Sequence, residues 1–67
     1  MVQLNNLGRN LHIVLYDKKM SKIDLARRVG TSGQMISYIV KGEKIPSTQL
    51  LVKIANVLNV TVDELLK

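Results

Sequence analysis

Four side chains that form hydrogen bonds or carry charge recur at helical spacing near the middle of the chain. They are Gln34, Ser37, Tyr38 and Lys41, and a turn of about 100° per residue places all four on one side of a helix. No acidic residue interrupts this stretch. Hydrogen-bonding groups and one cation without opposing carboxylates suit a groove lined by phosphates. Such a face is suited to reading a nucleic-acid groove, although a merely polar surface helix could also show this pattern.

Gln34 is the best candidate for reading a base. Its amide donates and accepts hydrogen bonds together, which matches the N6 and N7 edge of adenine. The short hydroxyl of Ser37 could reach base edges or water, and Tyr38 is long enough to meet a phosphate or a thymine methyl. We rank Ser37 and Tyr38 below Gln34.

Little in the chain could support catalysis or hold a metal. His12 is the only histidine, cysteine is absent, and no carboxylate cluster surrounds His12 at metal-ligand spacing. Ser21, Ser32, Ser37 and Ser47 have no base in a local motif, and no phosphate-cradling glycine motif is present. We expect no enzyme activity, no catalytic residue, no metal site and no cofactor.

Length and charge narrow the class of protein. A chain of 67 residues is expected to form a single domain, residues 1–67. The net charge is +5, and seven of the ten basic residues lie between positions 18 and 44, opposed there only by Asp24 and Glu43. This excess favours a polyanion-binding face, although a solubilising surface explains the charge equally well.

The composition also bears on location. Without cysteine the chain has no disulfide framework, which fits a reducing compartment. No apolar run approaches the roughly 20 residues that span a bilayer, and the start lacks the pattern of a secretory signal. We expect a cytoplasmic protein, associated with the nucleoid when bound to DNA, with no membrane contact and no small-molecule ligand.

Five helical patterns separated by short polar turns predict an all-α fold. The first covers about residues 4–17, and its apolar face is made by Leu4, Leu7, Leu11, Val14 and Leu15. Ser21, with Asp24 three residues on, is expected to cap a second helix that Gly30 ends. Its expected inner residues are Ile23, Ala26 and Val29.

The remaining three helices have their own start signals. Thr31 or Ser32 could each cap the third helix, and the sequence does not decide between them. Ser47 after Pro46 marks the start of a fourth helix. Its buried stripe is expected to be Leu50, Leu51, Ile54, Ala55 and Leu58. Thr61 and Glu64 form a capping box for a short fifth helix with Leu65 inward.

The run from Leu25 to Ile39 resembles a helix-turn-helix. Ala26 stands where two helices touch, Gly30 lies in the turn, and Ile36 and Ile39 face inward. The likeness extends from Leu7 and Gly8 to Leu65 and Leu66, and is to the Cro and phage-repressor family of XRE type. It implies a compact five-helix lambda-repressor-like domain whose helix-turn-helix is formed by helices 2 and 3.

The resemblance also implies roles for particular residues. The third helix, around residues 32–40, would enter the major groove of double-stranded DNA. Candidate base-reading residues are Gln34, Ser37, Tyr38, Ser32 and Gly33. Candidate phosphate-binding residues are Lys22, Thr31, Lys41, Lys44 and Ser21. Many relatives have glutamine in place of Lys22, and Gly33 occupies a common base-reading position without a side chain, so more reliance on DNA shape is expected.

The resemblance further implies a transcriptional repressor. Because the family mostly binds DNA as two-fold dimers, we expect this protein to act as a homodimer on a palindromic operator. Candidate dimer residues are Val57, Val60, Val62 and Leu66, of which only a subset should be exposed. The alternative is a helix-turn-helix fold used to dock a protein, such as an antirepressor or a toxin. That alternative predicts exposed aliphatic residues on the third helix. Attachment to an anionic membrane is a weaker hypothesis.

Overall fold

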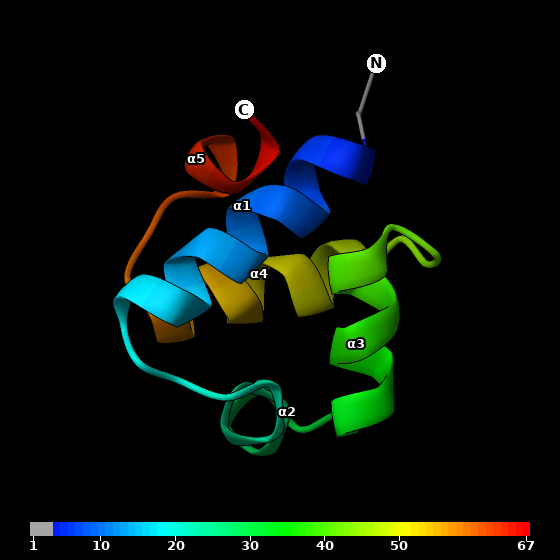
Figure 1. Ribbon diagram of the computed structural model, residues 1–67, viewed down its shortest axis with the longest axis vertical. Helices are drawn as coiled ribbons and strands as arrows, with labels where there is room; N and C mark the ends of the chain where they lie inside the picture. The colour runs from blue at the N-terminus through cyan, green and yellow to red at the C-terminus, as the bar shows by residue number, and fades with distance from the viewer. Residues whose placement is uncertain (1–3) are drawn as a thin grey trace.

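The computed structural model describes residues 4–67, which form five α-helices and no strand. The helices are α1 (Leu4–Asp17), α2 (Lys22–Val29), α3 (Gly33–Lys41), α4 (Thr48–Leu58) and α5 (Val62–Leu66). Figure 1 shows α3 along one edge of the molecule, with α2 seen end on beneath α1 and α4. The predicted all-α fold with a lambda-repressor-like order of helices is confirmed.

One continuous core draws on all five helices. The fully buried or nearly buried apolar side chains are Leu7, Leu11, Leu15, Leu25, Ala26, Val29, Ile36, Ile39, Ile54, Ala55, Leu58 and Leu65. The stripes predicted for the first, fourth and fifth helices agree with this set, except that Val14, Leu50 and Leu51 are only partly buried. Leu4 was predicted on the same apolar face, but its side chain lies outside the described residues.

The inner face predicted for the second helix is partly wrong. Ile23 is 63% exposed, whereas Leu25 is completely buried beside Ala26 and Val29. A helix this short presents two apolar stripes that share Ala26 and Val29, and the docking of α2 on α3 and α4 buries the one that contains Leu25. The side chain of Ile23 is consequently left at the surface.

Serine and threonine caps fix where four helices begin. The hydroxyls of Ser21, Ser47 and Thr61 each accept the backbone N–H three residues on, at 3.0–3.2 Å. The capping boxes predicted at Ser21 and Thr61 are both complete. For the third helix the structure chooses Ser32, whose Oγ accepts the Met35 N–H at 3.1 Å.

A left-handed residue follows each of the first four helices. Gly30 (φ 82°) and Gly42 (φ 79°) follow α2 and α3, and Asn59 (φ 57°) follows α4. After α1 the left-handed residue is Lys19 (φ 55°) rather than a glycine. The Met20 N–H that follows it donates to the Leu15 carbonyl at 2.9 Å and closes the end of the helix.

The first helix ties α3 and α5 together. Gly8 permits the close approach of α1 to α3, because a β carbon at Gly8 would collide with the backbone carbonyl of Val40. On another side of α1, the Asn10 amide donates to the Leu65 carbonyl at 2.9 Å, and the Asn6 amide donates to the Lys67 carbonyl at 3.0 Å. These asparagines bond carbonyls that the short α5 cannot satisfy itself.

Candidate nucleic-acid interface

The turn between α2 and α3 holds the two helices in a fixed arrangement. The N–H groups of Gly30 and Thr31 both donate to the Ala26 carbonyl at 2.9 Å. Thr31 is half-buried, and Ser32 follows it as the exposed cap of α3. Gly33 then passes close to α2, since a β carbon there would lie 3.2 Å from Cγ1 of Ile23. This is the compact packing that a helix-turn-helix requires.

The third helix separates apolar and polar residues as predicted. Ile36 and Ile39 are buried, whereas Gln34 and Lys41 are exposed. Ser37 and Tyr38 are half-buried on the outward side. The helix carries no acidic residue. Its exposed side therefore presents amide, hydroxyl and ammonium groups together.

Three residues of this face form a connected group. The Gln34 amide nitrogen Nε2 donates to the Tyr38 hydroxyl at 2.9 Å, and the two residues lie one helical turn apart. The Lys44 ammonium from the loop after α3 lies 5.1 Å from the centre of the Tyr38 ring, within range of a cation–π contact. A hollow of about 300 Å³ beside them is lined by Ser32, Gln34, Met35, Tyr38 and Lys44. Sequence reasoning placed Tyr38 and Lys44 in separate roles and missed this association.

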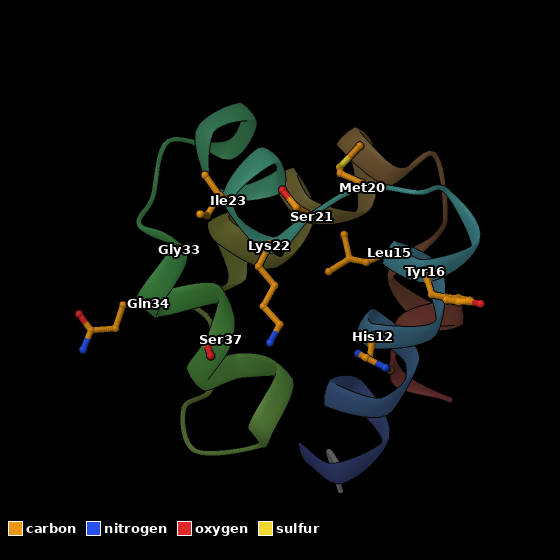
Figure 2. A pocket seen from close by; sticks show the side chains of 10 residues that line it. All are labelled: His12, Leu15, Tyr16, Met20, Ser21, Lys22, Ile23, Gly33, Gln34 and Ser37. Carbon is orange, nitrogen blue, oxygen red and sulfur yellow. The ribbon is translucent and has the colours of Figure 1, made fainter.

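A larger groove, about 710 Å³, separates α3 from the end of α1. Its lining residues are His12, Leu15, Tyr16, Met20, Ser21, Lys22, Ile23, Gly33, Gln34 and Ser37. Figure 2 shows the Lys22 side chain extending between Ser37 and His12, while Gln34 points away from the groove. The α3 residues that line the groove are Gly33, Gln34 and Ser37.

Asp24, in the first turn of α2, belongs to the capping box of that helix. Hydrogen bonds from the side chain and then the backbone of Ser21 lower the pKa of Asp24, and Arg27 and Arg28 add smaller effects in the same direction. Asp24 is thus held as a carboxylate at the helix N-terminus, where its charge is favourable.

The predicted site residues fall into three groups. Ser21, Lys22, Gly33, Gln34 and Ser37 lie around the large groove. Thr31 and Ser32 form the turn, and Tyr38, Lys41 and Lys44 lie toward the end of α3 and its following loop. The residues predicted for a dimer interface are all half-buried and pack against the core: Val57, Val60, Val62 and Leu66.

Among residues 4–67, no group of histidine, cysteine, aspartate or glutamate side chains is arranged to hold a metal ion. Within the same residues, no helix has the length and hydropathy needed to cross a membrane.

A buried five-helix core that presents an acid-free polar helix after a tight turn is the arrangement of a helix-turn-helix domain. The sequence profile of the helix-turn-helix family matches residues 16–65. The chain therefore belongs to this family, as the resemblance to XRE-type regulators predicted.

Solved structures of regulators share the fold. The clp gene regulator ClgR from Corynebacterium glutamicum is 27% identical, with a TM-score of 0.89 over 94% of this chain and 67% of that one. The c2 repressor of P22, solved in complex with a synthetic operator, is 26% identical, with a TM-score of 0.87 over 91% of this chain and 92% of that one.

A third match shows the fold alone. The restriction-modification controller protein C.AhdI from Aeromonas hydrophila is 24% identical, with a TM-score of 0.87 over 92% of this chain and 94% of that one. A comparison with curated protein sequences found no significant match.

Proposed function

We propose that this protein is a transcriptional repressor that binds a two-fold-symmetric operator as a homodimer and reads it with α3. The observation that carries the proposal is the outward face of α3, where Gln34 is exposed in an acid-free helix between Lys22 and Lys44. The family membership and the operator complex of the P22 c2 repressor support the same function.

Each residue of the face has a proposed role that follows from its chemistry. Gln34 contacts a base edge, and Ser37 and Tyr38 supplement it. Ser32 and Gly33 lie at the leading end of α3, where backbone and small side chains come close to the bases. The proposed phosphate contacts are Lys22, Thr31, Lys41, Lys44 and Ser21.

Dimerisation would bring two such faces onto one side of the duplex, about 34 Å apart. The proposed contact uses the exposed parts of Val57, Val60, Val62 and Leu66, all of which are only half-buried within one subunit. Because a single module covers too little DNA for high specificity, pairing would supply the discrimination that a repressor needs. Occupation of a promoter by the dimer would then prevent transcription.

The test is selection of a randomised duplex library by the protein at about 150 mM salt, followed by sequencing. The expected result is a palindromic motif with half-sites about one turn apart. Gln34→Ala, selected in parallel, should lose the preference at one position of each half-site. Gln49→Ala, which removes an exposed glutamine from α4, is the matched control and should recover the wild-type motif.

A second candidate function is docking of a partner protein, and the large groove favours it. Tyr16 is 72% exposed at the groove, and Ile23 adds a further exposed apolar side chain. However, the large exposed apolar residues among positions 6–67 do not include any from α3, where the docking alternative expected them. Recovery of no motif in the selection would favour docking over DNA reading.

A further inference from the structure

The bond between Gln34 and Tyr38 bears on which base α3 reads. The Gln34 Nε2 group is the donor and the Tyr38 hydroxyl oxygen is the acceptor, at 2.9 Å. One of the two amide N–H groups is therefore engaged within the protein. The other N–H and the carbonyl oxygen Oε1 are left for a ligand.

A glutamine amide can in principle match either purine. With one N–H and the carbonyl facing outward, it donates to N7 and accepts from the N6 amino group of adenine. With both N–H groups facing outward, it donates to N7 and O6 of guanine. A rotation of the amide by about 180° interconverts these patterns, so an unrestrained glutamine separates the two bases poorly.

The observed bond selects the adenine pattern. Because Nε2 donates to Tyr38, only one N–H remains free, and Oε1 stays available as an acceptor. The guanine pattern would instead require the Tyr38 hydroxyl to donate to Oε1, which reverses the direction of the bond. Whatever fixes the direction of the Tyr38 hydroxyl thus fixes the base.

A phosphate beside Lys44 would fix that direction. The Lys44 ammonium lies 5.1 Å from the centre of the Tyr38 ring, and both residues line the hollow of about 300 Å³ with Ser32 and Gln34. A phosphate oxygen accepts hydrogen bonds, so the Tyr38 hydroxyl would donate to it while accepting from Gln34. Linked bonds of this kind strengthen each other.

The geometry points to Tyr38 as a specificity-determining residue that holds the Gln34 amide so that it reads adenine rather than guanine. A phosphate bound by Lys44 and Tyr38 thereby sets the orientation of the base-reading Gln34 amide. This inference rests on the proposed function, because it assumes that α3 lies in the major groove.

The test compares wild type with Tyr38→Phe, which removes the hydroxyl and keeps the ring beside Lys44. Competition binding would use duplexes that differ only at the base pair whose selection Gln34→Ala abolishes, with A·T replaced by G·C. Wild type is expected to prefer adenine by about tenfold or more. Tyr38→Phe, which also loses the hydroxyl's contact with the phosphate, should weaken the adenine duplex more than the guanine duplex and lower the preference to about two- to threefold. Tyr16→Phe removes the hydroxyl of the other tyrosine and should keep the full preference.

A measurement without DNA tests the bond itself. The side-chain amide signals of Gln34 in a ¹⁵N–¹H spectrum should shift in Tyr38→Phe and remain in place in Tyr16→Phe. The same spectra report whether each variant is folded. Unmoved Gln34 signals in folded Tyr38→Phe would overturn the inference whatever the protein binds.

The DNA results separate the two proposals. If Tyr38→Phe keeps the adenine preference that Gln34→Ala loses, the positioning role is wrong and sequence-specific reading stands. If Tyr38→Phe weakens the adenine and guanine duplexes equally, Tyr38 is only a phosphate contact, and the inference is again overturned. If wild type selects no motif, the proposed function fails and the inference fails with it.

Discussion

Gly8 of α1 lies directly against the backbone carbonyl of Val40 at the end of α3. A β carbon on Gly8 would overlap that carbonyl oxygen and would lie 3.0 Å from the carbonyl oxygen of Ile39. Both neighbours are backbone atoms, so no side chain can rotate away to make room. The approach of α1 to the proposed reading helix therefore depends on the absence of one methyl group.

A methyl group added at Gly8 should disturb this approach. Gly8→Ala should gain about 1 kcal/mol of helix propensity yet destabilise the domain, because overpacking against backbone costs about 1–3 kcal/mol or more. We expect a net loss of about 1–2 kcal/mol, a fall in Tm of several degrees for a chain of this size. Thermal and urea unfolding would measure it. An unchanged or higher Tm would show that α1 and α3 can separate at little cost.

The same substitution at Gly33 should have the opposite effect. A β carbon there would lie 3.2 Å from Cγ1 of Ile23 and 3.9 Å from its Cα, the second an ordinary contact, and the Ile23 side chain is exposed and can turn toward solvent. Gly33→Ala should therefore stabilise the domain by a few tenths to about 1 kcal/mol. Unfolding under the conditions used for Gly8→Ala provides the comparison, and a clear loss of stability would mean that Ile23 is fixed in place.

Acid should weaken the domain through its two capping boxes. Hydrogen bonds from Ser21 lower the pKa of Asp24 from its ordinary value of 3.8, and those from Thr61 lower the pKa of Glu64 from 4.5. A lowered pKa in the folded state means stability that is complete above the ordinary value and is lost as pH falls through the folded value. Tm should therefore decline as pH falls from about 4.5 toward 2.

Variants identify the source of this decline. Asp24→Asn and Glu64→Gln should each lower Tm at pH 7 and flatten the fall below pH 4.5, because the titrating carboxylate has been removed. Glu43→Gln removes an exposed carboxylate that caps no helix and is the control. If all three variants keep the wild-type profile, the caps do not govern acid stability.

The salt dependence of DNA binding should identify the side chains that bind phosphates. Removal of one phosphate-binding cation should reduce the slope of log K against log salt by about 1. Lys22→Gln and Lys44→Gln are expected to do so, whereas Lys53→Gln, an exposed lysine on α4, should leave the slope unchanged. Titrations of one duplex at several salt concentrations would provide the slopes. Equal slopes for all three variants would remove Lys22 and Lys44 from the interface.

Much of the fold could be predicted from short local signals. Ser21, Ser47 and Thr61 begin helices as expected, since a cap depends on residues only three positions apart. Ile23 was placed wrongly because periodicity shows that a helix has an apolar face but does not fix its rotation against neighbours. Burial of Leu25 in its place is a result of tertiary packing.

Less of the proposed interface than of the fold could be predicted from the sequence. The acid-free side of α3 could be found by projection, because it depends on helical periodicity alone. The contacts of Tyr38 with Gln34 and Lys44 could not be predicted, because they depend on side-chain rotamers and on the path of the loop after α3. The large groove likewise follows from the position of Lys22 between helices that are distant in sequence.

The hydrogen bonds from α1 to α5 also limit when the native core can form during synthesis. Asn10 bonds to the carbonyl of Leu65, which is 55 residues later, and Leu65 is completely buried in the core. While the ribosome is still adding those residues, a side of the first helix remains without its partner. The core can therefore close only once Leu65 is available to it, so the five helices reach their native packing together rather than one by one.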